Sequence, residues 1–191
     1  VRAVTAVDLP AERAPAERAP SRPFAGAPHG VIALLGLGGL FAGLTTSLVG
    51  AYVPPLVQDV LGDRRTAIGA VMAIDNVLLL ALVPWAGPAS DRAAAAGRGR
   101  LPIVLAGMAL AAFGMAVLPA TRGAGLAPLV GALVVLHAGS NVQRAPLKAL
   151  VADLVPSRHR SRATGAVTFQ TCAGAILFLV LGRALGMRPA F

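Results

Sequence analysis

Four polar side chains recur at helical spacing inside an otherwise apolar stretch of this sequence. They follow one another at intervals of four, three and four residues: His137, Asn141, Arg144 and Lys148. At about 100° per residue this spacing places them on one stripe of an α-helix, whereas Gln143 falls on another. Groups of these types bind protons and polar solutes, and their cost in an apolar medium favours a function for Asn141 and Arg144. His137 could equally be a packing residue, and Lys148 is better explained by a side chain that reaches the edge of the apolar layer.

Another apolar run has an acid near its middle, Asp75, followed directly by Asn76. Asp75 could carry a proton, bind a cation or act as the counter-ion of Arg144. The alternative is a structural pair with Asn76 or with a neighbouring helix. We favour the functional interpretation, because an ionisable group in hydrocarbon is costly to keep. We predict that Asp75 and Arg144 share one water-filled cavity.

A short polar segment, residues 87–100, separates two of the apolar runs and is called the arginine-rich segment below. Its glycines and charged residues are Gly87, Asp91, Arg92, Gly97, Arg98 and Arg100. Asp91 is expected at the C-terminal end of a helix, where the macrodipole disfavours an anion, so it needs a nearby arginine. Asp153 stands at the end of a later run in the same way, shortly before Arg158. These charges predict a latch that breaks when the protein changes state; a solvated loop that only sets the topology is the alternative.

Five long apolar runs supply the elements that must position these groups. A helix needs about 20 residues to cross about 30 Å of hydrocarbon. We predict membrane-spanning helices over residues 31–53, 66–85, 101–120, 126–150 and 166–181. Pro54 and Pro55 are expected to end the first helix, and Pro84 to bend or end the second. The sequence therefore predicts an all-α integral membrane protein.

The overall composition agrees with this class. Of 191 residues, 56% are hydrophobic and only 13% are charged, which is less charge than a soluble domain of this length needs on its surface. A soluble all-helical protein with a large core is the alternative. The net charge of +9 would indicate nucleic acid in a soluble protein, but aromatic residues make up only 4% and the charges are scattered among loops. We therefore expect no nucleic-acid partner.

The sequence contains no catalytic Ser-His-Asp order, no Gly-rich nucleotide motif and no cluster with metal-ligand spacing. Its one cysteine, Cys172, lies in an apolar run and supports neither a disulfide nor a metal site. We expect no enzyme activity, no cofactor and no metal.

The first 29 residues are rich in Pro, Ala, Arg and Glu, repeat Ala-Glu-Arg-Ala-Pro, and lack the apolar core of a signal peptide. They are predicted to be a disordered tail. Arginines in this tail and in the loops after the second and fourth runs outnumber those on the other face. The enrichment of basic residues in cytoplasmic loops therefore predicts a cytoplasmic N-terminus in a multi-pass protein of the cell membrane.

The arginine-rich segment resembles the signature between helices two and three of the major facilitator superfamily. That signature is a glycine, three residues, Asp-Arg, and then a Gly-Arg-rich turn, which residues 87–100 match. The longer gap before Gly97, the pair Asp75-Asn76 ahead of Pro84, and the segment 144–162 look more like one branch. That branch is the glycoside–pentoside–hexuronide:cation symporters with the related proton-linked sucrose carriers.

Three positions depart from the family pattern. Leu79 and Val83 stand where melibiose-type members carry cation-binding acids, so a proton is the better expectation than sodium. Gly99 replaces an arginine that is common in the loop signature.

The resemblance implies twelve helices in two six-helix halves that rock to give alternating access. Residues 30–191 would then be part of an N-terminal half, five helices of six, and the chain a fragment or truncated product that lacks its C-terminal half. The implied function is secondary active transport, with a sugar-like solute and a proton as partners in the lipid membrane. Efflux of drugs or metabolites by a protein of the same superfamily is the alternative, as is a membrane fragment that transports nothing.

Overall fold

The structure, a computed structural model, describes residues 28–184 as helices joined by short turns. The helices are α1 (Pro28–Leu61), α2 (Arg65–Met72), α3 (Ile74–Ala95), α4 (Leu101–Val117), η1 (Leu118–Thr121), α5 (Leu126–Leu154), η2 (Ser157–His159) and α6 (Arg160–Ala184). Counting α2 with α3 and each short 3-10 helix with its neighbour, five helical segments within this range are long and apolar enough to cross a membrane. This confirms the predicted all-α class. The tail predicted over residues 1–29 lies almost wholly outside the described residues.

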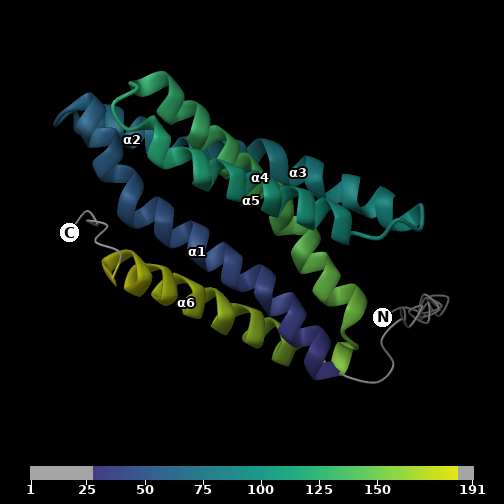
Figure 1. Cartoon of the computed structure of the whole chain (residues 1–191). Helices are drawn as coiled ribbons and strands as arrows, with labels where there is room; N and C mark the ends of the chain where they lie inside the picture. The colour runs from purple at the N-terminus through teal and green to yellow at the C-terminus, as the bar shows by residue number, and fades with distance from the viewer. Residues whose placement is uncertain (1–27, 185–191) are drawn as a thin grey trace, which may run out of the picture.

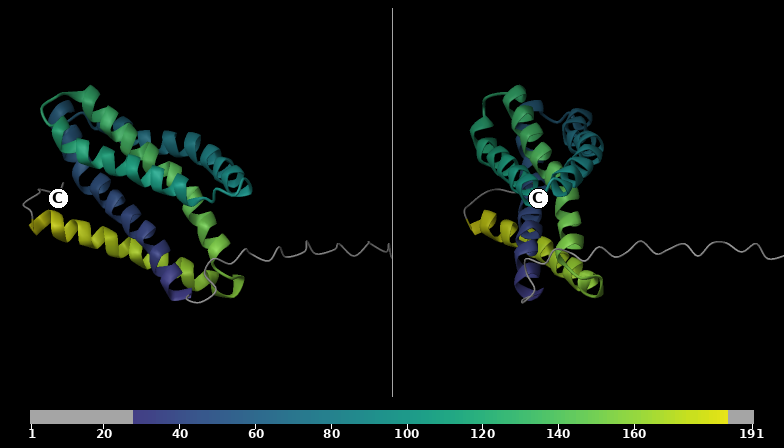
Figure 2. Two further views of the ribbon diagram at one scale, coloured as in Figure 1. Left: turned by 45° about the vertical axis from the view of Figure 1, so that its right-hand side comes forward. Right: turned by 90° about the vertical axis from the view of Figure 1, so that its right-hand side faces the viewer.

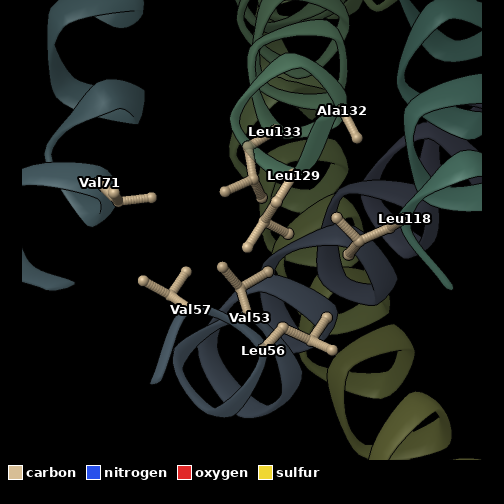
Figure 3. Close-up of a cluster of buried hydrophobic side chains, with 8 residues drawn as sticks. All are labelled: Val53, Leu56, Val57, Val71, Leu118, Leu129, Ala132 and Leu133. Atoms are coloured by element: carbon tan, nitrogen blue, oxygen red, sulfur yellow. The ribbon is translucent and has the colours of Figure 1, made fainter. Parts of the chain in front are cut away.

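Successive membrane-length segments run in opposite directions, so the bundle has two ends (Figure 1). The turns at residues 96–100 and 155–159 lie at one of them, which we call the arginine-rich end. Buried apolar side chains form a cluster toward each end. The first apolar cluster, drawn in Figure 3, lies away from the arginine-rich end and contains Val53, Leu56, Val57, Val71, Leu118, Leu129, Ala132 and Leu133. The second apolar cluster, at the arginine-rich end, contains Ile32, Leu35, Val151, Val155 and Ala163.

Helix α5 is the centre of the bundle, because it packs against α1, α3, α4 and α6. Helix α6 lies alongside α1 in both Figure 1 and Figure 2. The α1–α6 contact depends on glycine: a Cβ atom at Gly43 would overlap the carbonyl oxygen of Thr171, and one at Gly174 would overlap that of Leu40. Close backbone approach through small residues is the usual way in which helices associate in lipid.

The predicted ends of the helices need two corrections. Helix α1 continues through Pro54 and Pro55 to Leu61, so these prolines do not end it. Helix α3 likewise passes Pro84 and Pro88 and ends only at Ala95, so the first two-thirds of the arginine-rich segment is helical. Prolines are tolerated here because neighbouring backbone and side-chain groups can satisfy the carbonyls that they leave free.

Asp75 lies near the single turn residue, Ala73, that separates α2 from α3. Ala73 keeps helical dihedral angles (φ −72°, ψ −13°) and its amide donates to the carbonyl oxygen of Gly69 at 2.9 Å, so Arg65–Ala95 forms one membrane-length segment. Asp75 therefore lies in the first turn of α3 and inside that segment.

Candidate functional site

Asp75 contacts two side chains of the central helix. Its Oδ1 atom accepts a hydrogen bond from Nδ2 of Asn141 at 2.9 Å, and Nδ1 of His137 lies 3.0 Å from the same oxygen. His137 and Asn141 are one turn apart on α5 and both are buried. The Asp75 side chain is 27% exposed. The three residues, which we call the Asp75 cluster, join α3 to α5 by a polar contact in the apolar interior.

A cavity of about 110 Å³ opens beside the Asp75 cluster, between α1 and α5. Water occupies about 10–15 Å³ of such volume per molecule, so the cavity has room for several waters. Its lining residues are Ala42, Thr45, Thr46, Val49, Asp75, His137, Ser140, Gln143, Arg144 and Leu147. Asp75 and Arg144 thus line the same cavity, although Arg144 is otherwise an exposed side chain.

The α5 wall of this region carries hydrogen-bonding atoms without partners. Within residues 28–184, Oγ of Ser140, Oδ1 of Asn141 and Oε1 of Gln143 are buried and form no hydrogen bond. Each is an acceptor, and Ser140 can also donate. Leaving such groups unpaired costs about 1–3 kcal/mol each. Ser140 and Gln143 also line the cavity, where water can supply the missing partners.

Helix α1 contributes two hydroxyls to the opposite wall. Thr45 donates to the carbonyl oxygen of Phe41 and Thr46 to that of Ala42, each at 2.9 Å. Such bonds to the preceding turn are common for threonine inside helices. Both side chains also line the cavity, with their oxygen atoms still able to accept a hydrogen bond.

The structure separates some of the residues that the sequence grouped together. Asn76 is exposed and does not line the cavity, and Lys148 is exposed near the arginine-rich end. Gln143, by contrast, is predicted to point away from the functional stripe but is buried and lines the cavity. The cavity extends around α5 toward α1, so it takes in more of the helix surface than a single stripe.

A second polar group lies at the arginine-rich end. Arg100 forms ion pairs with Asp91 of α3 and with Asp153 of α5, the latter with Nε 2.6 Å from Oδ2. Its Nη1 atom also donates to Oγ of Ser90 at 3.0 Å, and Ser90 in turn donates to the carbonyl oxygen of Gly87. Hydrogen bonds from Arg100 to Asp91 and then to Asp153 raise the pKa of the guanidinium, so its charge persists at every physiological pH. This arrangement, the Arg100 bridge, joins the ends of α3 and α5.

Local backbone geometry explains why Arg100 reaches both acids. Helix α3 ends in a turn in which the amide of Gly97 donates to Ala94 and that of Arg98 to Ala93, each at 3.0 Å. Gly97 and Gly99 have φ angles of +76° and +71°, a conformation that glycine adopts without strain. The chain then reverses within a few residues, and Arg100 stands at the start of α4 facing the ends of α3 and α5. Gly87 lies inside α3, where an added Cβ atom would meet Cβ of Ala145 on α5 at 4.0 Å.

The remaining arginines at this end take no part in the bridge. Arg92 and Arg98 are exposed and form no ion pair within the described range. Arg158 donates from Nε to Nε2 of His159 at 3.1 Å. Arg160 donates to the carbonyl oxygens of Ala152 and Val155 and so caps the end of α5.

Sequence reasoning did not single out three participants. Ser90 is fully buried and contacts Arg100, and its position directly before Asp91 is the available signal. Thr45 and Thr46 line the cavity, and their place in a polar trio within a Gly-rich apolar run is the corresponding signal.

Comparison with known protein families places these features in context. The model of the Major Facilitator Superfamily matches residues 35–191, which is most of the chain. The chain therefore belongs to the major facilitator superfamily, and the five membrane-length helices within residues 28–184 make it a multi-pass membrane protein of a transporter family. No curated protein and no solved structure matches the chain.

Proposed function

We propose that this transporter is a secondary carrier that couples the movement of a proton to uptake of a sugar or glycoside by alternating access. The observation that carries the proposal is the Asp75 cluster, an ionisable carboxyl held by Asn141 and His137 at the edge of a polar cavity. Ionisable groups at such depth usually mark an ion or solute pathway.

The cluster has the properties that a proton carrier needs. Asn141 and His137 both contact the Asp75 carboxyl at Oδ1, and among residues 28–184 no hydrogen bond reaches Oδ2. That oxygen can therefore take up a proton while Asn141 continues to hold the carboxyl in place. Arg144 lines the same cavity and supplies a positive charge that interacts with Asp75 only while the carboxyl is ionised. Protonation of Asp75 would thus change the electrostatic balance of the cavity.

The cavity walls favour a neutral solute with several hydroxyl groups. The unpaired acceptors of Ser140 and Gln143 and the oxygen atoms of Thr45 and Thr46 match O–H donors. A lipophilic drug would leave these groups unpaired, at a cost in affinity. Leu79 and Val83 provide no carboxylate to ligate sodium, which supports a proton as the coupling ion.

The Arg100 bridge is the proposed gate. It ties α3 to α5 at one end, and alternating access requires the helices around a central site to open at one end at a time. We place this end in the cytoplasm, together with the N-terminus, because it carries most of the arginines. That surface then carries further positive charge that takes no part in the Arg100 bridge, from Arg92, Arg98 and Arg158.

Proton movement that follows addition of a solute tests the proposed function. Cells that express the protein are suspended in weakly buffered medium, and external pH is followed while glycosides are added one at a time. At least one glycoside should cause a saturable rise of external pH that a protonophore abolishes. If no glycoside moves protons while the cells extrude a lipophilic cation such as ethidium, the protein is an efflux carrier and the proposal is wrong.

The proposed orientation gives a separate expected result. In a Cys172→Ser background, the variants Arg92→Cys and Ser157→Cys should react with a membrane-impermeant maleimide only in inside-out vesicles. Arg122→Cys, an exposed position in the turn before α5, should react only in right-side-out vesicles. Labelling of positions 92 and 157 from different sides would contradict the topology itself, and labelling of both from outside would reverse it.

A further inference from the structure

The turn between α5 and α6 carries positive charge that no neighbouring acid neutralises. From Leu154 to Ala184 the chain has four arginines and no acid. The acid just before this stretch, Asp153, is already paired with Arg100. Three of the four arginines fall within five residues at the start of α6, and His159 lies among them.

These three arginines do not have equal roles. Arg160 is occupied by the carbonyl oxygens of Ala152 and Val155, at 2.9 and 3.3 Å. Arg158 uses only its Nε atom, toward His159, and both Arg158 and Arg162 are exposed. Neither forms an ion pair within the described part of the chain. Two guanidinium groups are thus open to an anion at the membrane surface.

An exposed apolar track begins at Arg162 and follows α6 along the described bundle. Phe169, Ile176 and Val180 follow Arg162 at intervals of seven, seven and four residues, a spacing that places all four on one stripe of the helix. The three apolar residues are 73%, 63% and 59% exposed in the described bundle. The stripe therefore begins with a positive charge and continues with apolar side chains. A phospholipid has the matching order, a phosphate followed by an acyl chain.

We propose that this surface binds an anionic phospholipid, with its phosphate at Arg158 and Arg162 and one acyl chain along Phe169, Ile176 and Val180. The site is separate from the cavity at Asp75 and does not depend on which solute is carried. Basic groups next to a membrane-spanning helix attract anionic headgroups, and each contributes about fivefold to binding, so loss of two should weaken binding about 30-fold.

Lipid binding to the purified protein in detergent provides the test. The probes are dioleoyl phosphatidylglycerol, dioleoyl phosphatidylcholine and inorganic phosphate, with thermal melting and native mass spectrometry as readouts. Phosphatidylglycerol should raise the melting temperature and remain bound, whereas phosphatidylcholine and inorganic phosphate should have little effect. The double variant Arg158→Gln/Arg162→Gln should need about 30-fold more phosphatidylglycerol for the same shift.

A matched control and a conservative variant make the outcome decisive. Arg64→Gln/Arg65→Gln removes the same charge from exposed positions at the other end of the bundle and should leave the lipid response unchanged. Arg158→Lys/Arg162→Lys keeps the charge and should retain most of the response, even if the glutamine variant fails to fold. An equal response to phosphatidylcholine, as expected if an acidic protein segment covers the arginines, would overturn the proposal. So would an equal shift with inorganic phosphate, or the same loss in the control.

Discussion

Replacing Asp75 by asparagine should abolish proton-coupled accumulation of solute while the protein is still made and folded. Asparagine keeps the size and the carbonyl oxygen that accepts the hydrogen bond from Asn141, but it cannot gain or lose a proton. We expect coupled uptake to fall by about 100-fold or more, the range that follows loss of a side chain that transfers protons. The measurement is external pH and solute accumulation in the same cells.

The control for this variant is Asp59→Asn, which removes the same charge from an exposed position near the end of α1. It should accumulate solute like the unchanged protein. Exchange of solute across the membrane without net proton movement can survive in Asp75→Asn, because binding and rocking do not themselves need the proton. Normal coupling in Asp75→Asn would remove Asp75 from the mechanism.

Replacing Arg100 by glutamine should have the second-largest effect. The change leaves Asp91 at the end of α3 without a counter-charge and releases Asp153 of α5 at the same time. The two carboxylates are 65% and 46% exposed, so each pair alone is worth under about 1 kcal/mol, but Arg100 itself is only 13% exposed and joins three groups. We expect the state in which this end is closed to lose about 1–2 kcal/mol of stability. Transport should then be about tenfold slower.

Two neighbouring substitutions test the geometry of the bridge. Arg98→Gln removes an exposed arginine of the same turn and should leave the transport rate nearly unchanged. Arg100→Lys keeps the charge but loses the planar guanidinium that reaches Asp91, Asp153 and Ser90 together, so it should recover only part of the rate. The gating role is wrong if Arg98→Gln is as damaging as Arg100→Gln.

The sequence was sufficient for the class and for part of the polar contacts. Runs of about 20 apolar residues predict membrane helices because a helix must satisfy its own backbone in lipid. Helical spacing put His137 and Asn141 on one stripe, and the structure places both against Asp75. The helix-dipole argument at Asp91 predicted an arginine partner, and the structure identifies it as Arg100.

Other features depended on three-dimensional contacts that spacing does not encode. Pro54 and Pro55 were expected to end α1, but the helix continues because backbone groups of a packed membrane helix tolerate a missing donor. Gln143 was assigned to another stripe, although the cavity reaches around α5 to it. Which arginine pairs with Asp91 depends on the turn at Gly97 and Gly99. An arginine at position 99 would be strained at the positive φ angle that Gly99 adopts.

The positions of the two apolar clusters matter for the leakage of protons through the proposed carrier. Along α1 and α5 the cavity at Asp75 lies between them: Val53 and Leu133 belong to the cluster on one side, Leu35 and Val151 to the cluster on the other. In the proposed proton carrier, each cluster would form an apolar barrier across one route by which water could reach the Asp75 carboxyl. A continuous file of water along α1 and α5 would then require both clusters to part at once. Side chains that only pack would thus limit the leak of protons across the membrane.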